Sequence, residues 1–343
     1  MASHQPATMK AWLYSSATGG LEKNLQLNLN APQPRQPLFK NEILVEVISM
    51  SVNPADAKLP ELGFVAKALI STPASPGLDY CGRVVATGTV VDSVRIGEII
   101  FGKLEKPTKF GTLGQYVVVT HEDCASLPDG VDPDHAAAIG TAGLTAYQSI
   151  VPYVKAGSKV FINGGSGGVG TFGIQIAKNA GCHVTTTCSA PNVSLCQELG
   201  ADDVIDYKTT DVYQELVARG QIFDLVVDNA GTPLNLYKDS ANFLKPEGIF
   251  EQVGGPMSFS GTATVASNML LPSFLGGGKR PYHFFVAKNS HDDLAEIGRL
   301  MKEGKIRAVI DSIFEYEDAP RAFEKLKTGR ARGKIVVHVT KKP

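Results

Sequence analysis

The middle of the chain alternates short apolar strands with helical segments, and this alternation restricts the folds available to it. The predicted strands are Lys159–Asn163, His183–Thr187, Val204–Asp206, Phe223–Asp228 and Gly248–Val253. The predicted helices between them are Val169–Ala180, Val193–Leu199, Val212–Ala218 and Leu236–Leu244. Apolar strands joined by helices are typical of a parallel sheet covered on both faces, so we expect a doubly wound α/β domain.

The first 130 residues have a different character, with short strands and Pro/Gly turns but few helices. The predicted strands include Glu42–Val52, Gly82–Gly88 and Gly114–Val119. This pattern indicates a barrel-like, partly antiparallel unit. An alanine-rich helical stretch, 136–150, marks the change to the α/β pattern, and a loop-rich segment is predicted over 256–281. The final strands and helices, 292–339, are expected to return to the first domain.

Length, charge and cysteine content exclude several classes of protein. A chain of 343 residues suggests two domains at about 150 residues each. With 33 basic and 34 acidic residues, bulk charge argues against nucleic-acid or membrane partners. No apolar stretch approaches the roughly 20 residues of a membrane span. The five cysteines form no CxxC motif, and the N-terminus has no apolar signal region, so we expect reduced thiols in a cytoplasmic protein.

A glycine-rich motif follows the strand Lys159–Asn163 and opens the next helix. The sequence from Asn163 to Gly170 reads NGGSGGVG, which contains GxGxxG at Gly165, Gly167 and Gly170. In this strand–helix context the glycines let the backbone approach a pyrophosphate, and the helix N-terminus attracts its charge. The motif predicts a dinucleotide site, with a glycine-rich turn that binds nothing as the alternative.

The end of the second strand bears on which dinucleotide binds. An NAD site usually has Asp or Glu there to hold the ribose 2′-hydroxyl, and none occurs between Gly181 and Glu198. Ser189, Asn192 and Tyr207 are neutral donors at suitable places for a 2′-phosphate. We therefore predict NADP(H) as the cofactor. The stretch from Ser189 to Asn192 can also be a capped turn, and both interpretations can hold together.

These motifs, in this order, resemble zinc-independent members of the medium-chain dehydrogenase/reductase superfamily, the quinone oxidoreductase-like and enoyl reductase-like proteins. The matching segments are SVNPADAK from Ser51, GLDYCG from Gly77, Ala136–Tyr147, LGADDVIDY from Leu199, FDLVVDNAG from Phe223 and RGKIVV from Arg332. The resemblance covers nearly the whole chain. It implies a Rossmann-type NADP(H)-binding domain, residues 135–286, inserted into a split GroES-like catalytic domain, residues 1–134 and 287–343.

The resemblance also allows a prediction about zinc. Zinc alcohol dehydrogenases of this superfamily carry a ligand histidine in a GHE motif, and Gly77-Leu78-Asp79 stands there in this chain. Their ligand cysteine falls near Ser51–Val52, where this chain has none. Leucine and valine cannot ligate zinc. We therefore predict no metal site.

Roles for individual residues follow from the resemblance alone. It implies pyrophosphate contacts from Ser166, Gly167, Gly168 and Val169, and a 2′-phosphate site at Ser189, Asn192 and Tyr207. It further implies cofactor contacts from Asn53, Thr145, Asn229, Gly254, Gly255, Phe284, Phe285 and Val286. A lysine is common in the family where Asn192 stands. Catalytic candidates are Lys58, Asn53 and Tyr80; a solvated lysine and a structural tyrosine are the alternatives for Lys58 and Tyr80. Asp56 is expected to fix its loop rather than to transfer protons.

The predicted function is NADPH-dependent hydride transfer to an activated carbon–carbon double bond or a quinone, with no zinc. Two alternatives stay open: an enoyl reductase acting in trans on carrier-bound polyketide chains, and a non-catalytic NADPH-binding protein. An apolar small molecule is the expected substrate, and the apolar residues between Met257 and Tyr282 could line its site. The resemblance favours a homodimer, with a monomer as the alternative.

Overall fold

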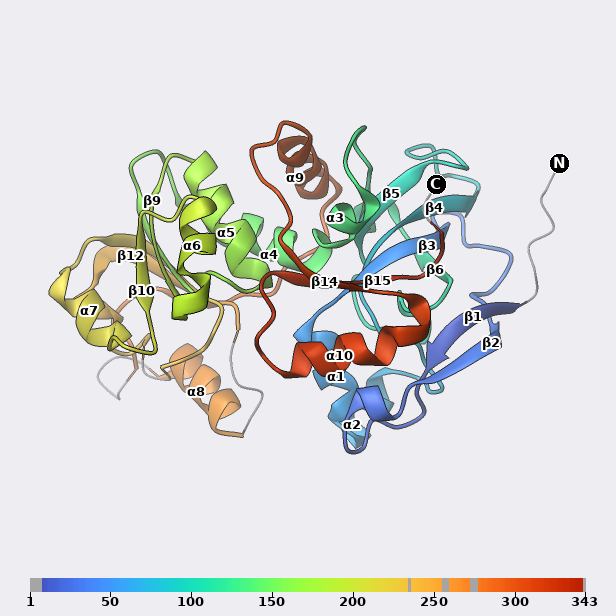
Figure 1. Ribbon diagram of the computed structural model, residues 1–343, viewed down its shortest axis with the longest axis horizontal. Coiled ribbons are helices and arrows are strands. Elements are labelled where there is room, and N and C mark those ends of the chain that lie inside the picture. Colours follow the sequence, from blue (N-terminus) through green and yellow to red (C-terminus); the bar gives the residue numbers. More distant parts are fainter. Residues whose placement is uncertain (1–7, 234–235, 255–258, 272–276, 342–343) are drawn as a thin grey trace. The chain divides into compact units, whose positions relative to one another are not determined.

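A computed structural model describes residues 8–233, 236–254, 259–271 and 277–341 (Figure 1). The chain divides into two compact units. The split unit comprises Met1–Leu144 and Lys288–Pro343, and the inserted unit comprises Thr145–Ala287. Each unit has its own main β-sheet.

The inserted unit is built on a six-stranded sheet in the order β10-β9-β8-β11-β12-β13, and every neighbouring pair is parallel. Its strands are β8 Lys159–Asn163, β9 His183–Cys188, β10 Asp203–Asp206, β11 Phe223–Asp228, β12 Leu244–Gln252 and β13 Tyr282–Phe284. Its helices are α5 Gly168–Asn179, α6 Val193–Glu198, α7 Val212–Ala218 and α8 Phe259–Leu270, while α4 Gly140–Ile150 crosses its N-terminal border. The strand order reverses direction between β8 and β11, as in doubly wound sheets, so the predicted fold class is confirmed.

The helix predicted over Leu236–Leu244 is wrong. A turn and the 3₁₀ helix Ser240–Asn242 occupy this stretch, and β12 already begins at Leu244. Leu236, Phe243 and Leu244 are buried together in the core of the inserted unit, so their helix-like spacing reflects packing of a turn. The polar residues around Ser240 favour local turns over a helix.

The loop-rich segment predicted over 256–281 is also wrong in part, because α8 lies within it. Its sequence, FSGTATVASNML, is poor in strong helix formers, which is why the sequence did not indicate it. The helix packs against β13, and this tertiary contact outweighs its weak propensity. Met257 and residues 272–276 of the predicted apolar wall lie outside the described residues.

The split unit is built on a second, mostly antiparallel sheet in the order β14-β15-β3-β4-β5-β7, with β6 beside β3. Its strands are β3 Ile43–Val52, β4 Asp79–Thr87, β5 Ile99–Lys103, β6 Tyr116–Val119, β7 Cys124–Ser126, β14 Ile310–Phe314 and β15 Lys334–His338; β1 Thr8–Leu13 and β2 Gln26–Pro32 form a separate pair. Its helices are α1 Pro54–Glu61, α2 Phe64–Leu69, α3 Pro133–Ala137, α9 His291–Lys302 and α10 Ala319–Lys327. The C-terminal strand β15 pairs antiparallel with β3, so the end of the chain completes the first domain.

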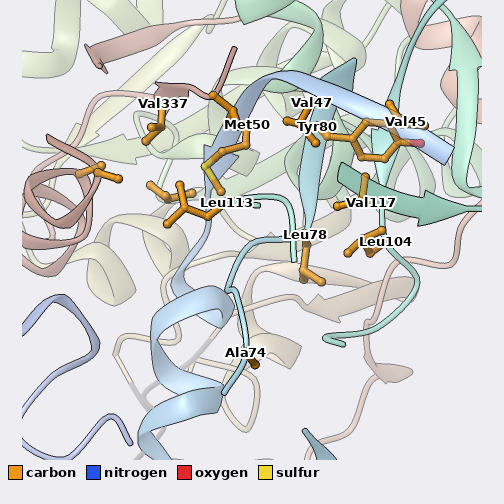
Figure 2. Close-up of a cluster of buried hydrophobic side chains, with 14 of the residues drawn as sticks. Val45, Val47, Met50, Ala74, Leu78, Tyr80, Leu104, Leu113, Val117 and Val337 are labelled. Carbon is orange, nitrogen blue, oxygen red and sulfur yellow. The ribbon is translucent and has the colours of Figure 1, made fainter. Parts of the chain in front are cut away.

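The core of the split unit lies against the inner face of this sheet. Figure 2 shows the side chains of Val45, Tyr80 and Val117 gathered on one side and Met50 pointing toward Leu113 on the other. All five are buried, and Tyr80 is among the largest fully buried side chains. The packing fixes the ends of β3 and β4, from which the polar residues of the unit project.

Two further observations concern the whole described chain. All five cysteines are free and buried, as the sequence predicted. Among the described residues, no helix combines the length and apolar character that crossing a bilayer requires.

Candidate nucleotide site and buried polar network

The glycine loop between β8 and α5 is closed to side chains at two positions and open at a third. A Cβ on Gly165 would lie 2.1 Å from Thr186 Oγ1, and one on Gly170 would lie 2.2 Å from the Gly164 carbonyl oxygen. Gly164 itself has φ +86°, which favours glycine. A Cβ on Gly167 would meet only the Gly164 oxygen, at 3.6 Å. The loop therefore needs glycine at Gly165 and Gly170 to fold, whereas Gly167 leaves room beside the backbone.

The N-terminus of α5 is open to an anion. The helix begins at Gly168, and no side chain caps it. The first N–H groups of a helix lack partners within the helix and carry its positive dipole. A partly exposed, uncapped helix start with this charge suits a pyrophosphate, so the loop fits a dinucleotide.

Three neutral polar side chains meet where β9 ends. Asn192 Nδ2 lies 3.2 Å from Ser166 Oγ and 3.3 Å from Ser189 Oγ, while its Oδ1 is buried and has no partner among the described residues. The Tyr207 N–H donates to the Cys188 carbonyl over 3.1 Å, which places Tyr207 beside Ser189, and its side chain is half exposed. The structure thus brings the side chains of Ser189 and Asn192 together and places the backbone of Tyr207 beside them; the 2′-phosphate site itself stays a prediction.

A second group lies at the ends of β11 and β12. Both polar atoms of the Asn229 side chain are buried and have no partner in the described part of the chain. A Cβ on Gly254 would lie 2.0 Å from the Asn229 carbonyl oxygen, so only glycine fits there. Gly255 lies outside the described residues. The unpaired amide of Asn229 can both donate to and accept from a ligand's hydroxyl groups.

A hydrogen-bonded chain that the sequence did not predict joins three strand ends under this loop. Thr187 Oγ1 donates to Asn163 Oδ1 over 2.6 Å, and Asn163 Nδ2 donates to Asp228 Oδ1 over 2.8 Å. Asp228 Oδ1 also accepts the N–H of Gly231 and of Ala230. Burial raises the pKa of Asp228 to about 6, although these hydrogen bonds oppose the shift. The sequence signal that could have indicated this hydrogen-bonded chain is the polar residue at or near the end of each of these apolar strands.

No hydrogen bond among the described residues joins the remaining predicted cofactor contacts of the inserted unit to the glycine loop, Asn192 or Asn229. These remaining residues are Thr145, Phe284, Phe285 and Val286. Thr145 is buried in α4. Phe284 and Val286 are exposed at the end of β13, and the Phe285 N–H donates to the Gln252 carbonyl.

The split unit contains a dry network of charged and polar side chains. Asp79 is fully buried, and its Oδ2 accepts from Lys334 Nζ at 3.1 Å, Asn53 Nδ2 at 2.9 Å and Ser51 Oγ at 3.1 Å. Lys334 is 3% exposed, and its ammonium also donates to Asn53 Oδ1 over 2.5 Å. Oδ1 of Asp79 accepts from the N–H and hydroxyl of Thr141. The Asn53 amide is therefore held on both sides by an ion pair.

Asp56 adjoins this network at the start of α1. Its Oδ2 accepts the Asn53 N–H over 2.7 Å, which completes a capping box, while its Oδ1 is buried without a partner among the described residues. Burial, and after it the nearby Asp79, raises the pKa of Asp56 to about 7, although the Asn53 N–H and Lys334 oppose the shift.

Lys58 and Tyr80, the other predicted catalytic residues, lie apart from the network. Lys58 is half-buried in α1, and no described residue forms a hydrogen bond or ion pair with its ammonium group. Tyr80 is fully buried, and its hydroxyl donates to the Asp123 carbonyl over 3.2 Å. This placement gives Tyr80 a packing role.

The positions where zinc alcohol dehydrogenases carry zinc ligands, by the resemblance described above, hold residues with other contacts in this chain. Ser51 donates to Asp79 and to the Ala137 carbonyl, and Leu78 is buried. Within the described ranges, no three His, Cys, Asp or Glu side chains gather in a way that could hold a metal ion.

Known proteins resemble this chain along its whole length. A family described as alcohol dehydrogenase GroES-like domain matches residues 40–129, and one described as zinc-binding dehydrogenase matches residues 199–337. The trans-enoyl reductase pgmF of Aspergillus terreus (strain NIH 2624 / FGSC A1156) is 47% identical over 353 residues, covering 99% of this chain and 98% of that protein. The chain belongs to the medium-chain dehydrogenase/reductase superfamily.

Two more distant relatives agree with this assignment to the medium-chain dehydrogenase/reductase superfamily. The human mitochondrial NAD(P)H oxidoreductase RTN4IP1 is 31% identical, covering 98% of this chain and 91% of that protein. The quinone oxidoreductase from Coxiella burnetii superposes with a TM-score of 0.82 at 31% identity, covering 97% of this chain and 99% of that chain. The chain is thus an oxidoreductase, and the predicted Rossmann-type and GroES-like fold is confirmed.

Proposed function

We propose that the chain is an NADPH-dependent, zinc-independent reductase that transfers a hydride to an activated carbon–carbon double bond or to a quinone. In this proposal the inserted unit binds NADP(H), and the split unit is the catalytic domain. The observation that carries the proposal is the meeting of Ser166, Ser189 and Asn192 at the end of β9, directly beside the glycine loop. The 47% identity to a protein named trans-enoyl reductase supports the reaction class.

NADP(H) fits the residues of the inserted unit. The room beside Gly167 and the uncapped start of α5 at Gly168 and Val169 suit the pyrophosphate, and the unpartnered Asn229 amide suits the ribose hydroxyls. Hydroxyl and amide donors at Ser189 and Asn192 can hold a 2′-phosphate, which a carboxylate there would repel. The phosphorylated nucleotide is therefore the proposed cofactor.

In the proposed hydride transfer, the protein orients the cofactor and the acceptor and stabilises the charge that develops on the acceptor. A bound nicotinamide supplies the hydride. The acceptor takes the hydride at its β-carbon, negative charge spreads to its oxygen, and a proton completes the reduction. Lys58 is the proposed donor toward that oxygen, because its half-buried ammonium is unpaired among the described residues. Asn53 has a positioning role, because Lys334 and Asp79 already occupy its amide.

Carrier-bound enoyl chains are a second candidate substrate class. The relative with 47% identity is named a trans-enoyl reductase, which places such chains beside free enones and quinones in the test. An enzyme specific for them would reduce an enoyl chain on its carrier protein and leave the same chain on a small thiol unreduced.

The test is NADPH consumption with a matched set of acceptors: an aryl enone, a quinone, an enoyl thioester of a small thiol, and the same enoyl group on a carrier protein. The proposal predicts turnover with at least one. Turnover with the carrier-bound chain alone would favour the trans-acting enzyme. NADPH binding without turnover of any acceptor would contradict the proposal and favour the non-catalytic alternative.

We also infer the setting in which the enzyme works. Five free, buried thiols are typical of a reducing compartment, and we propose the cytoplasm. β13 is an edge strand of its sheet, and exposed Phe284 and Val286 continue it. A second copy that covered this edge would pair its open strand, so we propose a homodimer, which sedimentation of the purified protein would test.

A further inference from the structure

Two residues of the split unit that line one small hollow each carry a buried polar atom without a partner among the described residues. Asp56 Oδ1 and Ser75 Oγ are buried, and neither has a hydrogen-bond partner among the described residues. The two residues are 4% and 2% exposed. Both line the same hollow, together with Tyr14, Leu59, Ile70 and Pro107. A buried polar atom without a partner is rare in folded proteins, and two around one space indicate a missing common partner.

The backbone around Ser75 explains why its hydroxyl is the free group. The Ser75 N–H donates to the Lys109 carbonyl, and the Ser75 carbonyl accepts the Gly111 N–H, both over 3.0 Å. On the other side, Asp56 Oδ2 is engaged by the Asn53 N–H, so Oδ1 is its free oxygen. The Ser75 hydroxyl, which can donate and accept, and the Asp56 Oδ1 oxygen, which accepts, are therefore the unpartnered groups of two residues that line one hollow.

The volume of the hollow limits the ligand to a single small molecule. Its free volume is about 10 Å³. A single water needs roughly 10–15 Å³ and two to four polar partners, so no larger ligand fits. The chemistry of the lining agrees, because a water can donate to a carboxylate oxygen while it accepts from a serine hydroxyl.

We propose that this hollow binds one water molecule, which bridges Asp56 and Ser75 and connects the Asp56 carboxyl with solvent. The connection runs through a larger surface pocket of about 230 Å³ that shares Tyr14, Pro60 and Ile70 with the hollow. Ser16 and Thr18 also line this larger pocket and give it a polar side. Asp56 is thus a hydrated proton-exchange site inside an otherwise dry network, a role beyond fixing its loop.

The charges around Asp56 determine what its protonation state does to the reaction. The charged groups whose fields act on Asp56 are Asp79 and Lys334, and Tyr14 also borders the hollow. Lys334 and Asp79 balance each other, so loss of the Asp56 proton leaves a net negative charge beside Asn53. If the proposed function holds, this charge opposes the negative charge that forms on the acceptor oxygen. Turnover then falls as pH rises through neutrality.

The direct test uses the protein without cofactor or acceptor. A high-resolution crystal structure should show one ordered water within hydrogen-bond distance of Asp56 Oδ1 and Ser75 Oγ. A dry hollow would overturn the proposal. These readouts need no turnover, so a protein that holds the water but oxidises no NADPH would contradict the proposed function alone.

A titration tests the link to solvent. The Asp56 carboxyl carbon, labelled with ¹³C and assigned with Asp56→Asn, should give one signal that moves smoothly with pH. Two signals in slow exchange would contradict the solvent route. Ser75→Val, which fills the hollow, should raise the midpoint by about one pH unit, a tenfold change, because the carboxylate loses its water.

Two further variants show whether the midpoint shift in Ser75→Val comes from loss of the water. Ser75→Ala keeps the hollow and removes one partner of the water, so it should raise the midpoint less than Ser75→Val. Ser240→Ala is the control, because Ser240 is also a buried serine with an unpartnered hydroxyl but belongs to the inserted unit. It should leave the Asp56 midpoint unchanged. An unchanged midpoint in Ser75→Val would also overturn the proposal.

Discussion

Lys208 is the only lysine or arginine between residues 181 and 210, and it follows Tyr207 at the proposed 2′-phosphate site. Its ammonium lies 5.2 Å from the centre of the Tyr207 ring, and no described residue forms an ion pair with it. The donors Ser189 and Asn192 are neutral, so Lys208 is the positive charge that this stretch of sequence offers a bound phosphate. We therefore expect Lys208 to contribute to binding of the proposed 2′-phosphate.

Lys208→Ala should weaken NADPH binding about tenfold, near 1.4 kcal/mol, and leave NADH binding unchanged. Lys155→Ala is the control, because Lys155 is an exposed lysine that precedes β8 at the opposite end of the sheet. Titration calorimetry with both nucleotides measures the effect. Equal losses for NADPH and NADH would show that Lys208 does not read the 2′-phosphate.

Lys334 and Asp79 form an ion pair that is almost completely buried. Removing one partner of such a pair leaves an uncompensated charge in a dry interior. Lys334→Met should therefore destabilise the split unit by about 3–5 kcal/mol. Urea unfolding followed by fluorescence measures the change, and the control is Lys325→Ala, because Lys325 is partly exposed and its ion pair with Asp311 lies nearer the surface. A loss below about 1 kcal/mol, as for a surface pair, would contradict the burial of this network.

Asp56 makes stability depend on pH in a defined direction. Its pKa rises from 3.8 when unfolded to about 7 when folded, so the folded state holds the proton more tightly. This contribution is complete below about pH 4 and is lost as the pH rises to 7, a difference of roughly 4 kcal/mol.

Asp56→Asn removes this titration and can still accept the Asn53 N–H. The wild type should therefore lose stability relative to Asp56→Asn between about pH 4 and pH 7, and the difference should stay constant above pH 7. Chemical unfolding across this range measures it. A difference that does not change with pH would contradict the raised pKa.

At the scale of elements, different glycines of the loop between β8 and α5 are needed for folding and for nucleotide binding. Gly165 and Gly170 leave no space for a Cβ, whereas a Cβ on Gly167 meets the loop only at 3.6 Å. Gly165→Ala should lower the melting temperature and abolish NADPH binding together. Gly167→Ala should leave the melting temperature within about 1 °C but weaken NADPH binding at least tenfold, because its methyl group enters the space proposed for the pyrophosphate.

Melting curves with and without NADPH distinguish these cases. Gly167→Ala should melt like the wild type without nucleotide and gain less stability when NADPH is added. Full stabilisation of Gly167→Ala by NADPH would place the nucleotide elsewhere.

Several elements could be predicted from the sequence because their patterns are local. The strands Lys159–Asn163 and Phe223–Asp228 and the helix Val212–Ala218 have the predicted bounds, since apolar runs and flanking glycines define them. The helix Phe259–Leu270 could not, because its contact with β13 rather than its composition holds it. The predicted helix Leu236–Leu244 fails for the opposite reason, since its apolar spacing comes from a packed turn.

The same distinction applies to the candidate site. Ser189, Asn192 and Tyr207 follow neighbouring strands of one parallel sheet, so their meeting could be predicted. The pair Asp79–Lys334 could not, because its partners are 255 residues apart and each sits in an apolar strand. Only the return of β15 alongside β3 brings Lys334 to Asn53, and no local pattern contains that pairing.

At the scale of the whole molecule, the proposal divides the work between two units. The inserted unit carries the neutral donors and the glycine loop that suit a phosphorylated dinucleotide, and the split unit carries the buried ion pair that holds Asn53. Neither unit alone is expected to reduce an acceptor, because the proposed phosphate-binding residues belong to the inserted unit and the proposed proton donor Lys58 to the split unit.

The most direct measurement of the central claim is isotope transfer from deuterium-labelled NADPH to an enoyl thioester or enone, followed by mass spectrometry and NMR of the product. A zinc-independent reductase of activated double bonds should give a saturated product with one deuterium at the β-carbon, in equal amount to the NADP⁺ formed, and the same transfer after treatment with a strong chelator. Deuterium on a carbinol carbon instead, or loss of transfer on chelation, would contradict a zinc-independent reductase of activated double bonds.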